Sequence, residues 1–138
     1  MPAADQKSIL VAEDNIVLSD VLRFNFERSG FVVTVAHTGS EALQRLQEDP
    51  YDLLFTDYNM PGVNGEELIS AIRGEFGLAD LPIVMCSAKG MELDVGRRAE
   101  KWGVAHVIFK PFSVRDVVAL ARSLTAAQIN NPQPMLAP

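Results

Sequence analysis

Several short apolar runs in the sequence end on a side chain that could take part in chemistry. The run Leu53–Phe55 leads through Thr56 to the carboxylate of Asp57, and the chain then turns at once through "NMPG". Other apolar runs end in the same way, and they are followed by Glu13 and Asp14, by Ser87, and by Lys110. If the ends of these runs meet, three carboxylates, a hydroxyl group and an ammonium group share one site.

These side-chain types suit the transfer of a phosphoryl group. Acids that lie close together repel one another unless a cation binds or one of them is protonated. Oxygen ligands suit a hard cation such as Mg²⁺ better than zinc, so we predict Mg²⁺ between Asp14 and Asp57. Asp57 is the expected nucleophile, because carboxylates form aspartyl-phosphates. Lys110 would place a point charge on a phosphate oxygen, and Ser87 would donate a hydrogen bond.

The segments around these side chains predict strands and helices in alternation. Strands are expected where short runs are continuously apolar or β-branched, and helices where apolar side chains recur every three or four residues. Asn15, Thr38, Asn64 and Ser113 are suited to cap helices, and Thr38 with Glu41 matches a capping box. The expected strands are 9–12, 31–36, 53–55, 83–86 and 104–109, each followed by a helix.

This alternation predicts a doubly wound α/β fold. Short apolar strands separated by amphipathic helices form a parallel sheet that is covered on both faces. Right-handed crossovers place the carboxyl end of every strand at the same edge of the sheet. Ligands of open α/β sheets bind outside that edge, so the acids, the hydroxyl group and the lysine are expected there together.

Composition limits the classes of protein that the chain can represent. Its 138 residues are enough for one domain with a sizeable core, and its net charge of −6 argues against a nucleic-acid-binding surface. The single cysteine, Cys86, rules out a disulfide within the chain, and in an apolar strand it is expected to be unreactive. The first residues lack the apolar stretch of a signal peptide, and no run approaches the ~18 apolar residues of a membrane span. These features predict a soluble, cytoplasmic protein.

Four motifs together resemble the receiver domain of two-component response regulators. They are "VAEDN" at 11–15, "DYNMPGVNG" at 57–65, "CSA" at 86–88 and "KPF" at 110–112, and their order and spacing match that family over 7–125. The resemblance implies a flavodoxin-like (βα)5 fold with a five-stranded parallel sheet in the order 2-1-3-4-5. It also implies phosphoryl transfer from a sensor histidine kinase or a histidine phosphotransfer protein.

The resemblance further implies a role for each candidate residue. Asp57 would accept the phosphoryl group. Glu13 and Asp14 would be the acidic pair of the Mg²⁺ site, with Asp14 as a direct ligand, and the backbone carbonyl of Asn59 would complete the protein's share of the ligands. The remaining implied features are Ser87 as the switch hydroxyl, Lys110 as the phosphate-sensing lysine, and a cis Lys110–Pro111 bond.

One position departs from the family pattern. The family usually has tyrosine or phenylalanine three residues before the lysine, whereas this chain has Val107. Valine is short and stiff about χ1, so it cannot repeat the swing of an aromatic ring into space vacated by the hydroxyl. The sequence does not decide whether Phe109 or His106 lies close to that position. His106 and His37 are otherwise expected to be surface or strand-end residues.

We predict a receiver domain over 7–125, with disordered segments at 1–6 and 126–138. The protein is expected to be a phospho-acceptor that switches a protein-interaction surface for a downstream protein. Its chemistry would be Mg²⁺-dependent self-phosphorylation and autodephosphorylation, and it would not be an enzyme that turns over a substrate. It would act as a stand-alone, chemotaxis-regulator-like receiver without direct contact to nucleic acid or membrane. Alternatives are a phosphorelay shuttle or sink, a receiver cut from a larger regulator, an Asp-nucleophile phosphatase, and a flavodoxin-like binding protein.

Overall fold

The central strand of the sheet explains how the two faces of the fold are built. In the computed structural model, which describes residues 6–88 and 92–129, β3 (Leu53–Asp57) is buried along its whole length. Alternate side chains of β3 enter different cores, with Leu54 in one and Phe55 in the other. A strand with an apolar layer on each face is continuously hydrophobic, as is typical of parallel sheets.

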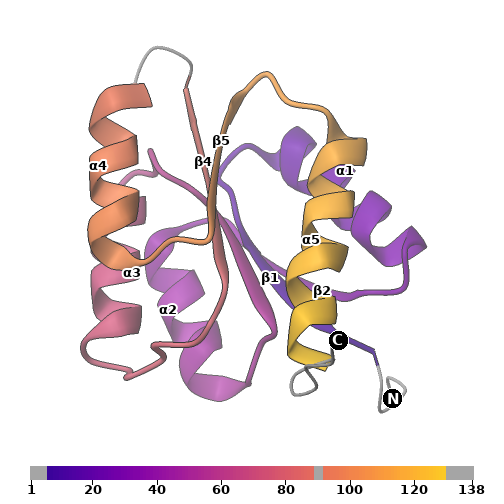
Figure 1. Cartoon of the computed structure of the whole chain (residues 1–138), viewed down its shortest axis with the longest axis horizontal. Helices are drawn as coiled ribbons and strands as arrows, with labels where there is room; N and C mark the ends of the chain where they lie inside the picture. The colour runs from indigo at the N-terminus through magenta and orange to yellow at the C-terminus, as the bar shows by residue number, and fades with distance from the viewer. Residues whose placement is uncertain (1–5, 89–91, 130–138) are drawn as a thin grey trace, which may run out of the picture.

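Five parallel strands pair in the order β2-β1-β3-β4-β5, which confirms the predicted doubly wound fold (Figure 1). The register aligns Val11 with Phe55 and Asp57 with Cys86, so the carboxyl ends of the strands lie at one edge. The remaining elements, in chain order, are β1 (Ser8–Ala12), α1 (Ile16–Arg28), β2 (Val32–Ala36), α2 (Gly39–Glu48), α3 (Gly65–Arg73), β4 (Ile83–Ala88), α4 (Glu92–Trp102), β5 (His106–Lys110) and α5 (Val114–Ile129).

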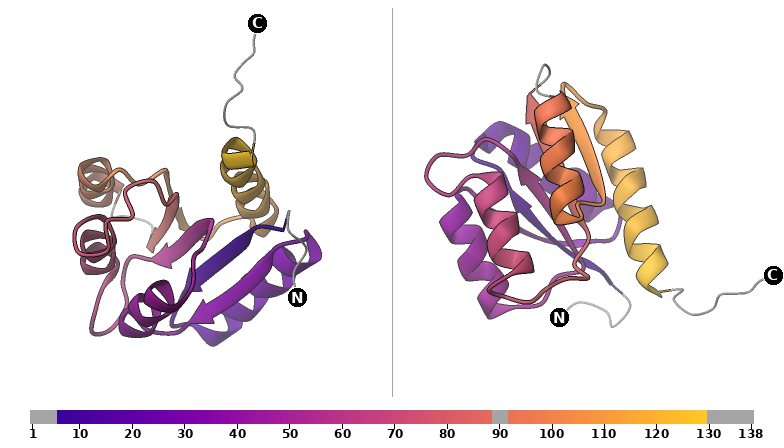
Figure 2. Two further views of the ribbon diagram at one scale, coloured as in Figure 1. Left: turned by 90° about the horizontal axis from the view of Figure 1, so that it is seen from below. Right: turned by 60° about the vertical axis from the view of Figure 1, so that its left-hand side comes forward.

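The helices form two layers. In Figure 1, α1 and α5 cover one face of the sheet, and α2, α3 and α4 cover the other. Figure 2 shows the same arrangement from below and from the side of α3 and α4. The core under α1 and α5 is rich in aromatic side chains, in which the rings of Phe26 and Phe55 meet edge to face at 6.5 Å between centroids. The core under the other three helices is mainly aliphatic.

The predicted caps of the first three helices are confirmed. Asn15 accepts a hydrogen bond from the Leu18 N–H at 3.0 Å, and Asn64 forms a complete capping box with Glu67. The box predicted at Thr38 is only half formed. Thr38 accepts from the Glu41 N–H, but the Glu41 carboxylate accepts from the N–H of His37, one residue before the cap. The helix still begins as predicted, because the Thr38 hydroxyl satisfies one of its free N–H groups.

The last helix extends beyond the predicted end of the domain. α5 continues to Ile129, so the predicted domain boundary at 125 falls inside a helix. Thr125 lies on the buried side of that helix and donates its hydroxyl hydrogen to the Ala121 carbonyl at 2.8 Å. The terminal segments 1–5 and 130–138 lie outside the described residues. Within the described part of the chain, no helix is both long and apolar enough to cross a membrane.

Candidate functional site

The structure brings the predicted site residues to the carboxyl edge of the sheet, the upper edge in Figure 1. Glu13 and Asp14 follow β1, Asp57 ends β3, and Lys110 ends β5. Ser87 lies one residue beyond Cys86, the register partner of Asp57. Residues far apart in the sequence thus meet because parallel strands place their carboxyl ends side by side.

Three carboxyl groups form a cluster at this edge. Ligand oxygens from Glu13, Asp14 and Asp57 all lie within 4.8 Å of one another. Glu13 and Asp57 are buried, whereas Asp14 is exposed. The cluster therefore has two acids fixed within the protein and a third that faces the solvent, the side from which a cation can approach.

Lys110 is the cation of the site. Its Nζ atom lies 3.5 Å from Glu13 Oε1 and 3.5 Å from Asp57 Oδ2. Burial lowers the pKa of Lys110, but the charges of Asp57 and Glu13 raise it by more, so the net pKa is above its ordinary value. Lys110 therefore stays charged and partly neutralises the two buried acids.

The buried acids resist ionisation. Burial is the main reason that the pKa of Glu13 rises from 4.5 to about 7. The Asn15 N–H, which donates to Glu13 Oε2 at 3.1 Å, lowers this pKa, and the charge of Asp57 raises it. Burial also raises the pKa of Asp57 above its ordinary value, against the opposing attraction of Lys110. A cation at the cluster would favour the charged forms of both groups.

Backbone contacts hold Asp57 in place at the end of β3. The Tyr58 N–H donates to the Cys86 carbonyl at 2.7 Å, and the Gly65 N–H donates to the Tyr58 carbonyl at 2.8 Å. The Asn59 N–H donates to Asp57 Oδ1 at 3.4 Å. These bonds tie the start of the loop after β3 to β4, close that loop at Gly65, and keep one oxygen of Asp57 oriented. The use of the Asn59 carbonyl as a metal ligand stays a prediction.

Ser87 is buried with an unused hydroxyl. It is 0% exposed, and within the described part of the chain its Oγ has no hydrogen-bond partner. Its register partner on β5 is Phe109, and the next pair along the strands is Ala88 with Lys110. The hydroxyl therefore lies beside the lysine end of the site and has a free donor hydrogen.

The structure resolves the question raised by Val107. Val107 and Phe109 both pack against the aliphatic core on the α4 side of the sheet, whereas His106 is exposed. Phe109 is thus an aromatic side chain on the same face of the sheet as Val107, and it is the register partner of Ser87 on the neighbouring strand. Sequence reasoning left this open, although the two-residue period of a strand places positions 107 and 109 on one face.

His37 is a contact residue that sequence reasoning missed. Its Nδ1 lies 3.1 Å from the backbone carbonyl of Glu13, so the protonated nitrogen can donate to that oxygen. His37 directly follows β2, the strand next to β1. This position at the carboxyl edge of the sheet could have indicated from the sequence that His37 lies near Glu13. Cys86, by contrast, is buried as predicted, and burial raises the pKa of its thiol to about 12.

The donor set of the cluster fits a hard divalent cation. All three candidate ligands are carboxylates, and the buried Glu13 Oε1 makes no hydrogen bond with the described residues. Oxygen-only sites with few protein ligands favour Mg²⁺, which keeps several waters. Zinc is a poorer match, because its sites usually include histidine or cysteine.

Comparison with known proteins gives consistent results in sequence and in structure. A family model for the response regulator receiver domain matches residues 9–122. The phosphate regulon transcriptional regulatory protein PhoB of Rhizobium meliloti is 39% identical over 116 residues, which are 84% of this chain and 51% of that protein. The chain therefore spans about half the length of this relative.

Solved structures share the fold over nearly their whole length. The receiver domain of the Francisella response regulator 1452 matches with a TM-score of 0.82 at 26% identity, over 89% of this chain and 99% of that chain. The chemotaxis response regulator CheY4 of Vibrio cholerae matches in fold, with a TM-score of 0.79 at 23% identity, over 86% of this chain and 98% of that chain.

Proposed function

The chain belongs to the family of response regulator receiver domains, and we propose that Asp57 is its phosphoryl acceptor. The observation that carries this proposal is the position of Asp57 at the carboxyl edge of the sheet, beside Lys110 and the carboxyl groups of Glu13 and Asp14. A carboxylate beside a fixed cation and a metal-binding cluster can approach a phosphoryl group without prohibitive charge repulsion.

The proposed step transfers a phosphoryl group from a phosphohistidine of a sensor kinase or a phosphotransfer protein. A carboxylate oxygen of Asp57 attacks phosphorus, the new P–O bond forms, and the P–N bond to histidine breaks. The histidine nitrogen keeps the bonding electron pair and takes a proton from solvent. The protein's share of such a transfer is mainly positioning and neutralisation of charge.

Glu13, Asp14 and Asp57 are the residues that would hold Mg²⁺, together with the carbonyl of Asn59. When bound, Mg²⁺ would neutralise negative charge on the incoming phosphoryl oxygens. Because Asp14 is exposed, it would be available to the ion from the solvent side, while Glu13 orders the loop through the Asn15 N–H.

Lys110 and Ser87 would contact the phosphoryl group after transfer. Lys110 Nζ stands 3.5 Å from both buried acids, longer than a strong charged hydrogen bond, and can turn to a phosphoryl oxygen. The unused Ser87 hydroxyl supplies a second donor. We infer that phosphorylation draws Ser87 toward the phosphate. Ser87 lies beside its register partner Phe109 on β5, so this movement alters the α4 side of the domain.

The competing functions have less support. A phosphatase of the haloacid dehalogenase type would have its nucleophile on the first strand, whereas Asp57 is on the third. A flavin-binding protein would need phosphate-binding donors after β1, where this chain has Glu13 and Asp14. The downstream protein, a cytoplasmic location, and a role as relay, sink or part of a larger regulator remain parts of the proposal.

The experiment that tests the proposal is phosphorylation by a small donor. The protein is incubated with MgCl₂ and acetyl phosphate, and its intact mass is measured with and without a chelator. We expect the mass of one phosphoryl group to be added, and we expect the gain to disappear in the Asp57→Asn variant and in chelator. The proposal is wrong if the wild type gains no mass, or if Asp57→Asn gains it at the wild-type rate.

A further inference from the structure

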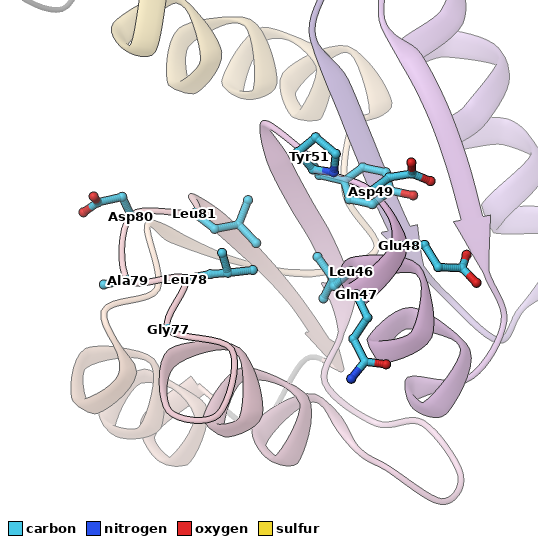
Figure 3. A pocket seen from close by; sticks show the side chains of 11 residues that line it. Leu46, Gln47, Glu48, Asp49, Tyr51, Gly77, Leu78, Ala79, Asp80 and Leu81 are labelled. Atoms are coloured by element: carbon cyan, nitrogen blue, oxygen red, sulfur yellow. The ribbon is translucent and has the colours of Figure 1, made fainter.

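A groove lies at the edge of the sheet opposite the acidic cluster (Figure 3). One wall is the end of α2 and the loop to β3, over 46–51, and the other is the loop between α3 and β4, over 77–81. The cavity has a volume of about 590 Å³, within the range of pockets that bind small ligands or the side chains of a partner. The proposed phosphoryl chemistry makes no use of it.

The floor of the groove is apolar. Leu46 and Leu81 belong to the aliphatic core, and Tyr51 packs against that core. Leu78 is 37% exposed, and within the described residues it is the only exposed large hydrophobic side chain outside α1. In Figure 3 the side chains of Leu46, Leu78 and Leu81 point into the space between the two walls. Covering this floor would remove apolar surface from water, which favours binding.

The rim of the groove is acidic. Figure 3 shows Asp80 at one end and Glu48 and Asp49 at the other. The lining includes no lysine or arginine, although Arg45 Nη1 lies 3.5 Å from Glu48 and partly neutralises it. The Asp49 backbone N–H donates to the Arg45 carbonyl, and the charge of Asp80 acts on the nearby Arg73. The two carboxylates themselves form no hydrogen bond or ion pair with other described residues, so they face an approaching molecule.

Arg73 holds one wall of the groove in position. Its Nη1 donates to the carbonyls of Leu78, Ala79 and Leu81 at 2.8–3.0 Å. The same guanidinium donates to the carbonyls of Trp102 and Gly103 at the end of α4. A wall that is already ordered loses little conformational entropy when a ligand binds. Because these carbonyls are already used, recognition falls to the apolar floor and the acidic rim.

We propose that this groove binds a segment of a partner protein in which an apolar side chain is flanked by lysine or arginine. The floor fits the apolar side chain, and the carboxylates at the two ends match cations on both sides of it. An acidic rim repels phosphate groups, nucleic acids and anionic membranes, so those ligands are disfavoured. Carboxylates at both ends suit an extended segment better than a single small cation.

The test uses the whole isotope-labelled chain and a synthetic peptide with two leucines between arginines and lysines. Backbone amide shifts are recorded by NMR during titration. We expect the shifts to be confined to 46–51 and 77–81. The double variant Asp49→Asn with Asp80→Asn should weaken binding about fivefold, the sum expected of exposed charge pairs. Leu78→Ser should weaken it about tenfold through loss of apolar contact.

Matched controls separate the groove from general attraction to an acidic protein. Asp20→Asn removes an exposed charge on α1, away from the groove, and should leave the dissociation constant unchanged. A peptide with glutamates in place of its basic residues should not bind. The proposal is overturned if the peptide shifts no amide at millimolar concentration, if the shifts centre on another surface, or if Asp20→Asn weakens binding as much as the groove variant.

Discussion

At the scale of single residues, Glu13 is an acid whose surroundings oppose its charge. It is fully buried, its pKa is about 7 instead of 4.5, and its nearest cation, Lys110, is shared with Asp57. Between these pH values the folded protein binds more protons than the unfolded chain, so stability falls as pH rises from 4.5 to 7. The loss of stability is complete above pH 7, and the full stability returns below pH 4.5.

Glu13→Gln should therefore stabilise the metal-free domain at high pH. We expect the variant to exceed the wild type in free energy of unfolding by roughly 3 kcal/mol at pH 8, because glutamine carries no charge to bury. The difference should disappear toward pH 4.5, where Glu13 is protonated in both states. Urea denaturation of both proteins in chelator across this range measures it, and a difference that does not change with pH would contradict the assignment.

Ser87 and Thr56 both carry buried hydroxyl groups, but removing these groups should change the stability of the domain in opposite directions. The Ser87 hydroxyl has no partner among the described residues, whereas the Thr56 hydroxyl donates to the Asp57 carbonyl at 3.0 Å. Ser87→Ala should raise the free energy of unfolding by about 1 kcal/mol, since it removes an unsatisfied polar group. Thr56→Val should lower it by about 1 kcal/mol. Destabilisation by Ser87→Ala in urea denaturation would show that its hydroxyl is paired in solution.

At the scale of secondary-structure elements, Arg73 links the end of α3 to the loop before β4 and to the end of α4 through five backbone carbonyls. Arg73→Lys should lower the free energy of unfolding by about 3 kcal/mol, because an ammonium group cannot reproduce the planar fork and leaves carbonyls unpaired. Hydrogen exchange should rise at 78–81 and 102–104. The control Arg23→Lys changes only an exposed ion pair with Glu27 and should alter stability by less than ~0.5 kcal/mol.

Two helical glycines form a second test of how the elements pack. A Cβ at Gly65 would lie 2.7 Å from Tyr58 Cα and 2.8 Å from the Asp57 carbonyl oxygen, whereas a Cβ at Gly96 meets open space. Gly65→Ala should lower the free energy of unfolding by about 2 kcal/mol and shift the amides around Asp57, because backbone must move. Gly96→Ala should raise it by up to ~1 kcal/mol through helix propensity. Equal effects in thermal denaturation would contradict the close approach at Gly65.

At the scale of the whole molecule, the proposed metal site links ligand binding to folding. The chain carries a net charge of −6, and three of its acids are held together only when the strands are assembled. A cation that binds this cluster binds the folded chain in preference to the unfolded one. The free energy of unfolding should then rise by ~1.4 kcal/mol for each tenfold increase in Mg²⁺ above its dissociation constant.

Asp14→Asn is the variant that tests this linkage. Because Asp14 is exposed, its replacement should leave the metal-free fold intact while the stabilisation by Mg²⁺ is lost. Phosphorylation by acetyl phosphate should slow by ~100-fold or more, since the metal contributes several kcal/mol to such transfers. Thermal denaturation with MgCl₂, and with NaCl at equal ionic strength, gives the comparison. Unchanged Mg²⁺ stabilisation in the variant would show that the ion binds elsewhere.

Much of the fold and of the candidate site could be predicted from the sequence because the signals are local. Apolar runs such as Leu53–Phe55, capping residues such as Asn15 and Asn64, and the strict alternation of elements all act over a few neighbouring residues. Parallel topology then requires the carboxyl ends of the strands to meet, so the convergence of Asp57, the acids after β1 and Lys110 follows from element order alone.

Other features depend on contacts between distant segments, which only the tertiary structure decides. Which side chain lies opposite Ser87 depends on the register of β4 and β5, and this register places Phe109 there. The five acceptors of Arg73 come from the loop before β4 and from the end of α4, which meet only when α3 and α4 pack, and the groove beside Leu78 depends on the same packing. The pKa of Glu13 likewise depends on burial by surrounding strands, because desolvation is a property of the assembled fold and not of the local sequence.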